Sequence, residues 1–514
     1  MLVTTRPILP ALCVVLLACG GGSSSPDAGS RVDGSVAPAA TARFEPPQPG
    51  GGAAWGQVPY PSDLYLDADG LLAISDLPVG PNADLPFVTM LLETLHTLDG
   101  AGLWSSVHIA IDGEIDPNSL AGNVVLVDLD DGLAEIQTDI VWRDDLRTIV
   151  AVPKHGILLR EQHRYGVYVT NQVRATDSSS LTAAPAFVAA ADLSTVPADP
   201  SVAAAQTSLR PLLEALDPST RATVVVASVF RTASIGAEAI AMRAAIAASP
   251  PTITVGQTFA GASALDGLFG AQAADAVPGQ LHGSANFRAQ PHGNVAAVIH
   301  GQIGLKSFLN ASTNTAGFAT FTGGVPEIKG THQAKYTLIL PQATSYAELP
   351  VVIFVPGINR PRVDMMTQAD TATDEGFALL SIDMMYHGDR ASQPTDVRNE
   401  TTGENAPDGF GDEVGLTPAV EFFHLTTSGG IPAYHPRAMR ENLRQAAMDL
   451  CSLVEWVADG DVAPLTAALG GLGLPTDLSF RSDAALLTES FGALVTGPCV
   501  AVEPRITAVM YSSP

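Results

Sequence analysis

The chain has 514 residues, 46% of them hydrophobic and 15% charged, and its formal net charge is −27 at pH 7. This length exceeds what one hydrophobic core sustains, so we expect two or three domains. The excess of acidic residues repels phosphate backbones and anionic lipid headgroups, which argues against nucleic acid as a partner and against a polybasic membrane contact.

Residues 1–18 have the pattern of an export signal, because Arg6 precedes an apolar run that is too short to span a bilayer. The segment Leu16-Leu17-Ala18-Cys19 resembles a bacterial lipobox, whose cysteine receives a diacylglycerol. An ordinary signal peptide with a chance cysteine is the alternative. Residues 19–52 are rich in Gly, Ser, Pro and Ala and predict a flexible linker. We therefore expect a protein of the cell envelope, lipid-anchored through Cys19 at the outer membrane or cell surface.

The cysteines carry little further information. Cys13 lies in the predicted signal and Cys19 is the predicted lipidation site, so Cys451 and Cys499 remain. In an exported protein these two form either one disulfide or two buried free thiols.

Residues 53–195 have the period-two pattern of short β-strands bounded by turn residues. The strand candidates are VHIAIDG, NVVLVDLDDG, IQTDIVW, TIVAVP and RYGVYVT. The segment resembles bacterial Ig-like domains in IDPNSLAGNVVLVD and LLREQHRYGVYVTNQVRA, where Tyr165 begins the penultimate strand. The resemblance implies an N-terminal antiparallel β-sandwich.

Two acidic segments raise the question of calcium. The first comprises Asp128, Asp130 and Asp131 before Gly132, and the second is the loop 403–415 with Asp408, Asp412 and Glu413. A hairpin turn accounts for the first segment and a solvated loop for the second, with a calcium site as the alternative for each. No cofactor is otherwise expected.

Residues 196–290 are expected to connect two domains. DPSVAAAQTSLRPLLEAL predicts a helix capped by Asp199 or Ser201, and ATVVVASVFRTAS predicts a buried strand. IGAEAIAMRAAIAAS predicts a second helix that ends before Pro250-Pro251. No chemistry is visible in this region.

Strands and helices alternate over residues 291–514, which predicts an α/β domain with a mostly parallel sheet. NVAAVIHGQIGLKSFL and AKYTLILPQ predict hairpin-like strands, and LPVVIFVPGIN and FALLSIDMMYHGDR predict buried strands. A helix from Asp364 to Glu375 lies between the buried strands, and PRAMRENLRQAAMDLCSLVEWVA predicts a long amphipathic helix. DAALLTESFGALVTG then gives strand, sharp turn and helix, and RITAVMY one more strand.

This region resembles the α/β-hydrolase superfamily, and within it the bacterial surface lipases of the virulence-factor type, whose catalytic domain follows an Ig-like domain. The resemblance rests on LPVVIFVPGINRPRVD, GFALLSIDMMYHGDR, MRENLRQAAMDLCSLVEWV and LLTESFGALVTG, in that order. It implies a serine carboxylic-ester hydrolase that acts on acyl esters or lipids.

By position, the resemblance makes Ser490 the nucleophile on a strained turn between strand and helix. Gly492 fits the small residue that this turn needs, whereas Thr488 departs from the usual glycine. A serine that merely caps a helix is the alternative. The two main-chain donors of an oxyanion hole would be the N–H groups of Ile358 and Phe491. Pro356-Gly357 stands where the family usually has His-Gly, which leaves a main-chain donor intact.

The partners of the serine are the difficulty, because the triad acid and histidine follow the serine in this fold. The residues after Ser490 include one acid, Glu503, and no histidine. His387 is a weaker base candidate with loop organisation as its alternative role, while His424 and His435 are weaker still. Asp383 is expected to fix a loop rather than to serve as triad acid. The sequence thus predicts a hydrolase truncated before its acid and histidine, weak or inactive. The alternatives are a non-catalytic surface lipoprotein or hydrolase remnant acting as a binding module, and a missing part supplied by a separate chain.

Overall fold

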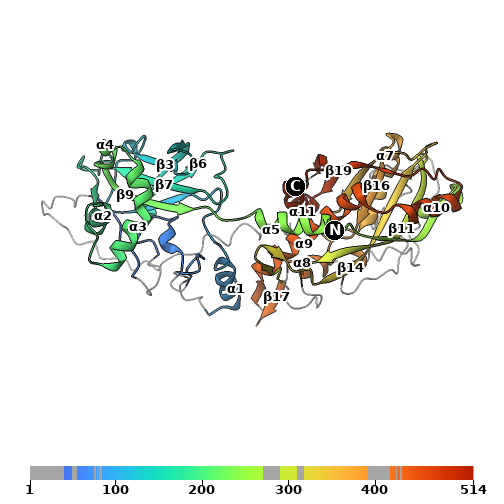
Figure 1. Ribbon diagram of the computed structural model, residues 1–514, viewed down its shortest axis with the longest axis horizontal. Helices are drawn as coiled ribbons and strands as arrows, with labels where there is room; N and C mark the ends of the chain where they lie inside the picture. Colours follow the sequence, from blue (N-terminus) through green and yellow to red (C-terminus); the bar gives the residue numbers. More distant parts are fainter. Residues whose placement is uncertain are drawn as a thin grey trace, which may run out of the picture. The chain divides into compact units, whose positions relative to one another are not determined.

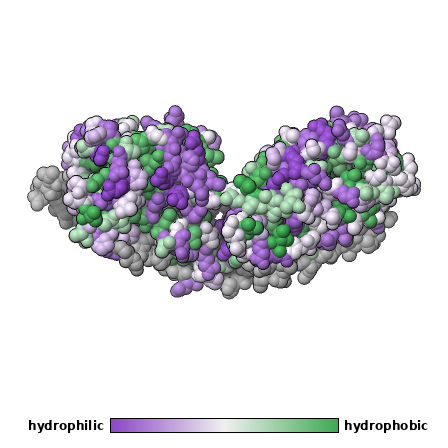
Figure 2. All heavy atoms as spheres, in the orientation of Figure 1, coloured by the Kyte–Doolittle hydropathy of each residue, from purple (hydrophilic) through white to green (hydrophobic). Residues whose placement is uncertain are grey.

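The computed structural model describes residues 40–48, 55–74, 77, 79, 84–269, 290–309, 318–391, 417–423, 425–428 and 431–512. They fall into two compact units, Met1–Ser234 and Ile235–Pro514 (Figure 1). The predicted signal, Cys19 and the loop 403–415 lie outside the described residues. Within the described ranges no helix combines the length and the apolar character that a bilayer span needs. Figure 2 shows hydrophilic and hydrophobic residues interspersed on the visible face of each unit.

The first unit has two sheets around one hydrophobic core. One sheet has the order β5-β6-β2-β1-β8 and the other β4-β3-β7-β9, and every pairing is antiparallel except that of β1 with β8. The strands are β1 (Thr41–Ala42), β2 (Val107–Asp112), β3 (Val124–Asp128), β4 (Ala134–Ile136), β5 (Thr138–Arg143), β6 (Thr148–Pro153), β7 (Arg164–Thr170), β8 (Thr182–Ala183) and β9 (Val224–Arg231). The helices are α1 (Pro86–Leu95), α2 (Pro185–Ala191), α3 (Pro200–Ala215) and α4 (Pro218–Arg221).

All five strand candidates of the first unit are confirmed as β2, β3, β5, β6 and β7. Their period-two pattern has a physical basis, since alternate residues of β2 and β6 are buried against the second sheet. Tyr165 is the second residue of β7, stacks on Phe230 and accepts a hydrogen bond from the Arg160 N–H at 2.8 Å. The Ig-like character of this unit stays a prediction.

The expected connecting region 196–290 is divided between the two units. Of the two predicted caps of α3, Asp199 and Ser201, the structure has Asp199, which accepts hydrogen bonds from the N–H groups of Ser201 and Val202. The buried strand that follows is β9, which pairs with β7 and completes a sheet of the first unit. The second predicted helix is α5 (Ala237–Ala247), and it belongs to the second unit together with β10 (Ile253–Ala260). Pairing partners far along the chain decide this division, and a local pattern does not show them.

The second unit is built on a seven-stranded sheet of order β10-β11-β14-β16-β15-β19-β20. Its remaining strands are β11 (Val295–Ser307), β14 (Gly330–Pro341), β15 (Leu349–Val355), β16 (Ala378–Ile382), β19 (Phe480–Glu489) and β20 (Ile506–Ser512). The pairs from β10 to β16 are antiparallel and those from β16 to β20 are parallel. The expected mostly parallel sheet is therefore wrong. The sheet is mixed, because β11 and β14 pair as a long antiparallel hairpin and β14 then pairs with β16, again antiparallel.

Helices cover both faces of this sheet (Figure 1). On one face α5, α9 (Pro436–Asp459) and α11 (Phe491–Val502) share a hydrophobic cluster with Val351, Ile353 and Val355 of β15. On the other face α6 (Ala262–Phe269), the 3-10 helix Arg362–Gln368 and α7 (Ala369–Asp374) pack against Phe354. The other elements are α8 (Thr417–Phe422), α10 (Ala463–Leu472) and the small pairs β12 (Phe321–Thr322) with β13 (Val325–Pro326) and β17 (Leu425–Ser428) with β18 (Ile431–Tyr434).

A disulfide joins α11, the helix that follows the nucleophile candidate, to the long helix α9. Cys451 of α9 and Cys499 of α11 are bonded, with their Cα atoms 5.8 Å apart. Of the two alternatives that the sequence leaves open, the structure has the disulfide. It fixes α11, and with it the turn before α11, to the long helix behind the sheet.

Candidate active site

Three loops meet at one edge of the sheet in the second unit. The strands β16, β15 and β19 run parallel, with Leu380 opposite Ile353 and Thr488 opposite Val355. Their carboxyl ends therefore lie at the same edge. Each of the following loops holds a non-glycine residue in the left-handed region: Tyr386 (φ 63°), Asn359 (φ 60°) and Ser490 (φ 49°). Such strained residues concentrate at functional sites.

Ser490 occupies the sharp turn between β19 and α11. Its backbone has φ 49° and ψ −117°, and its side chain makes no capping hydrogen bond to the helix. The alternative of a helix-capping serine therefore does not hold. The Ser490 N–H donates to the Ser512 carbonyl at 2.8 Å, and its carbonyl accepts from the Ala493 N–H at 3.0 Å. The turn is thus held by the backbone, and the exposed hydroxyl takes no part in holding it.

Two glycines allow the turn to approach the neighbouring loop. A Cβ at Gly492 would lie 2.5 Å from the Val355 carbonyl oxygen and 2.7 Å from that of Pro356. A Cβ at Gly357 would lie 3.4 Å from the Cβ of Ser490. Thr488, the departure from the expected glycine, is fully buried and its hydroxyl donates to the Met510 carbonyl of β20 at 3.1 Å. The β-branched side chain is therefore accommodated by the adjacent strand.

Ile358 lies in the loop after β15, directly after Gly357, and Phe491 directly follows Ser490. Within the described residues, neither N–H donates a hydrogen bond to a protein acceptor. Phe491 is the first residue of α11, so the helix dipole increases the partial positive charge at its N–H. The structure brings Gly357 close to Ser490 and places Gly492 against the carbonyls of Val355 and Pro356.

His387 contacts the Phe491 ring, and no hydrogen bond joins its imidazole to the Ser490 hydroxyl among the described residues. Its imidazole is fully buried and stacks on the Phe491 ring at 6.4 Å between centroids and an interplanar angle of 15°. Nδ1 is 2.7 Å from the Met385 carbonyl, which places the ring proton there, and Nε2 is buried without a partner among the described residues. Burial lowers the pKa of His387 to about 4, so the ring is neutral at pH 7. This geometry favours the loop-organising role.

The other described sequence candidates have partners other than Ser490. His435 caps α9 by accepting a hydrogen bond from the Ala438 N–H at 3.3 Å, and His424 lies outside the described residues. Glu503 follows α11 at the amino end of β20, the opposite edge from Ser490. It is buried and pairs with Arg243 of α5 at 2.9 Å. Among the described residues no imidazole nitrogen hydrogen-bonds the Ser490 hydroxyl.

Asp383, at the end of β16, fixes two loops at once. One carboxylate oxygen accepts from the Arg362 N–H at 2.7 Å, and the other accepts from the Asp389 N–H at 3.1 Å. The Arg362 guanidinium forms an ion pair with Asp383 and a second with Asp389. The loop after β15 is thereby bonded to the loop that carries His387. Gly388 (φ 50°) is required here, because a Cβ would collide with the Asp383 carboxylate.

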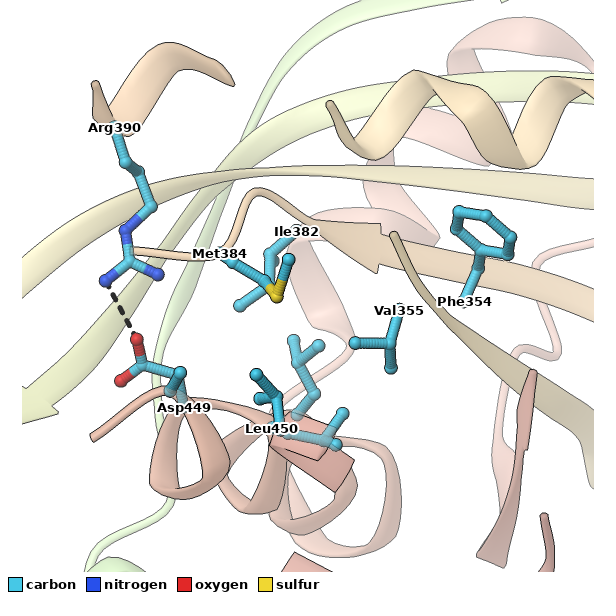
Figure 3. A pocket seen from close by; sticks show the side chains of 10 residues that line it. Phe354, Val355, Ile382, Met384, Arg390, Asp449 and Leu450 are labelled. Carbon is cyan, nitrogen blue, oxygen red and sulfur yellow. Dashed lines mark hydrogen bonds and ion pairs between the residues drawn. The ribbon is translucent and has the colours of Figure 1, made fainter. Parts of the chain in front are cut away.

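A small cavity lies beneath these loops, between the ends of β15 and β16 and the helices α9 and α11 (Figure 3). Figure 3 shows Arg390 and Asp449 pointing toward each other at its rim, with 2.8 Å between Nη2 and the carboxylate. The volume of about 20 Å³ has room for a single water molecule. This cavity therefore cannot hold an acyl chain.

The acidic segment of the first unit is a turn. Asp130 pairs with Arg164 and Asp131 with Arg160, which fits the hairpin interpretation. Among the described residues, no group of three His, Cys, Asp or Glu side chains could hold a metal ion. The second acidic segment, with Asp408, Asp412 and Glu413, lies outside the described residues.

Three residues that shape the loops at this edge of the sheet were not predicted from the sequence. Asn359 and Tyr386 adopt left-handed conformations, and only the asparagine has a type that favours them. Arg362 is fully buried, and no local pattern distinguishes it from a surface arginine.

Comparisons with known proteins give only distant likenesses. No family model and no curated protein matches the chain. Similar solved structures include a predicted acetyl xylan esterase from Bacteroides fragilis (10% identity, TM-score 0.27, 53% of this chain and 51% of that one). A second is a peroxisomal alpha-beta-hydrolase from Saccharomyces cerevisiae (14% identity, TM-score 0.23, 43% of this chain and 44% of that one). A third is a rice cell wall degrading esterase from Xanthomonas oryzae (9% identity, TM-score 0.22, 51% of this chain and 48% of that one).

These neighbours are α/β-hydrolases and esterases at low identity. The chain spans about half the length of the first of them, 51%. Similarity this low does not assign the chain to a family. It is a partial, α/β-hydrolase-like match over about half of this chain.

Proposed function

We propose that the second unit is a serine carboxylic-ester hydrolase with Ser490 as nucleophile. The observation that carries this proposal is the backbone of Ser490, whose left-handed φ exposes the hydroxyl at a turn between a buried strand and a helix. The glycines at 357 and 492 let this turn contact the loop after β15. A strand-to-helix turn of this kind is the setting in which serine hydrolases hold their nucleophile.

The chemistry follows from these positions. The Ser490 oxygen adds to the ester carbonyl carbon, and the carbonyl oxygen becomes an oxyanion as the π-bond electrons move onto it. The N–H groups of Ile358 and Phe491 bind that oxyanion. The alcohol then leaves, and water releases the acid from the acyl-serine. The serine proton passes through solvent to the oxygen of the leaving alkoxide, because no imidazole nitrogen of the described residues hydrogen-bonds the Ser490 hydroxyl and Nδ1 of His387 lies against the Met385 carbonyl. We therefore expect slow turnover.

Modification of Ser490 by a fluorophosphonate probe tests the proposal even where turnover is weak. We expect labelling of the wild-type chain and slow hydrolysis of a p-nitrophenyl ester, both lost in Ser490→Ala. Ser482→Ala is the matched control, since this exposed serine lies on the same strand at its other end. Labelling that persists in Ser490→Ala, or a wild-type chain that never labels, refutes the assignment.

A non-catalytic binding role is the second candidate. It is favoured by the surroundings of His387, whose buried ring is held in place by a carbonyl and an aromatic stack rather than by the serine. In that case the wild-type chain would not label although Ser490 is exposed.

We further propose that the protein is anchored in the cell envelope through a lipid on Cys19. This proposal rests on the sequence of residues 1–52 alone, and the acyl-ester or lipid substrate class rests on the family resemblance. Incorporation of labelled palmitate in a bacterial host, lost in Cys19→Ala, is the expected result. Secretion of an unlabelled wild-type chain would contradict anchoring.

A further inference from the structure

Asn359 connects the loop after β15 to a helix that lies far along the chain. Its Oδ1 accepts a hydrogen bond from the Ala419 N–H of α8 at 2.9 Å. Asn359 is in the left-handed region and directly follows Ile358, the proposed oxyanion donor. Since a fixed side-chain bond restricts the backbone that carries it, the orientation of the neighbouring Ile358 N–H depends on where α8 lies.

The far end of α8 rests on the second donor residue. Phe422, the last residue of α8, is fully buried and packs edge-on against the Phe491 ring, with centroids 4.9 Å apart and planes at 86°. The Phe422 carbonyl accepts from Asn442 Nδ2 of α9 at 2.8 Å. The helix is thus bonded to the loop of Ile358 at one end, and to α9 and Phe491 at the other.

We propose that Asn359 is a positioning residue that holds α8 across both oxyanion donors, so that the spacing of the Ile358 and Phe491 N–H groups depends on the Asn359–Ala419 hydrogen bond. The inference rests on the proposed function for its catalytic consequence. Oxyanion donors act only when they sit about 2.7–3.1 Å from the position of the developing charge. A loop that drifts by a fraction of that distance loses transition-state stabilisation while ground-state binding is preserved.

The first arm of the test measures the tether without reference to activity. Asn359→Gly keeps the left-handed backbone and removes the acceptor, whereas Asn359→Asp keeps both. We expect faster hydrogen–deuterium exchange of residues 417–423 in the glycine variant and wild-type exchange in the aspartate variant. Glu348→Gly is the matched control, because Glu348 (φ 51°) is an exposed left-handed residue just before β15. Equal exchange in wild type and Asn359→Gly overturns the tether.

The second arm measures the consequence for hydrolysis of a p-nitrophenyl ester. We expect Asn359→Gly to lower kcat by about tenfold with little change in KM, as for loss of a transition-state interaction. Glu348→Gly should keep the wild-type values. Raised exchange in α8 with unchanged kcat overturns the positioning role. A wild-type chain without hydrolysis refutes the proposed function and this catalytic consequence together, while the exchange result still decides the tether.

Discussion

Gly492 lies directly against the main chain of Val355. A side chain of any size at residue 492 would bring its Cβ to 2.5 Å from the Val355 carbonyl oxygen, closer than van der Waals contact permits. The two strands that end at this point, β15 and β19, are neighbours in the sheet, so neither loop can retreat without breaking their pairing. The sharp turn between β19 and α11 at Ser490, here called the elbow, therefore depends on the absence of a side chain two residues later.

Gly492→Ala should displace this elbow. We expect a loss of about 1–3 kcal/mol in the free energy of unfolding, as for overpacking of a buried site, together with loss of fluorophosphonate labelling at Ser490. Gly497→Ala is the control within the same helix, because a Cβ there meets open space. That change should be neutral or slightly stabilising. Wild-type labelling in Gly492→Ala would show that the elbow tolerates a Cβ.

Asp383→Ala should strongly destabilise the second unit. It removes one of two carboxylates from Arg362, whose guanidinium is fully buried, and frees the N–H groups of residues 362 and 389. Breaking a buried ion pair costs about 3–5 kcal/mol, and we expect about 3 kcal/mol because Asp389 remains. Urea unfolding measures this loss. Asp145→Ala, which removes an exposed partner of Arg143, should leave the unfolding midpoint unchanged.

Loss of the disulfide should loosen the helix behind the elbow. Cys451 and Cys499 are 48 residues apart in the chain, and closing such a loop stabilises by about 4 kcal/mol in the chain-entropy account. Replacing both by alanine should lower the melting temperature, and reductant should do the same to the wild type. Reductant must not affect the double variant. A wild-type chain insensitive to reductant would mean that the thiols are free in solution.

The longer strands of both units except β10 could be predicted, because burial imposes a local pattern, whereas β1 lies within the segment 19–52 that the sequence predicts as a linker. In β5 and β6 every second residue faces the core, and β15 and β16 read as apolar runs because helices cover both of their faces. The sharp turn at Ser490 was predicted from the family resemblance, because the local pattern of a buried strand followed by Ser490 and Gly492 also fits a helix-capping serine.

The rest depends on contacts between distant segments. The direction of β14 against β16, the bond from Asn359 to Ala419 and the burial of Arg362 all join residues that no local period relates. Even the orientation of His387 could not be predicted. The His-Gly pair indicates a tight loop, but the aromatic rings that enclose the imidazole come from α8 and α11.

The buried imidazole of His387 should make stability depend on pH. Burial lowers its pKa from the ordinary 6.5 to about 4 in the folded chain, so between these values only the unfolded chain binds the proton. The stabilisation is complete above pH 6.5, falls as the pH drops, and is lost by about pH 4. The full shift corresponds to about 3 kcal/mol, of which about 2 kcal/mol falls between pH 6.5 and pH 5.

His387→Phe isolates this contribution, because phenylalanine keeps a ring against Phe491 and does not titrate. Urea unfolding at pH 7 and pH 5 should show that the variant loses about 2 kcal/mol less than the wild type between the two values. Asp364, whose pKa burial raises to about 6, changes stability in the opposite direction, but it does so in both proteins and cancels in the difference. Equal losses of unfolding free energy in the two proteins would mean that the imidazole of His387 is exposed to water. The ring would then not be packed against Phe491.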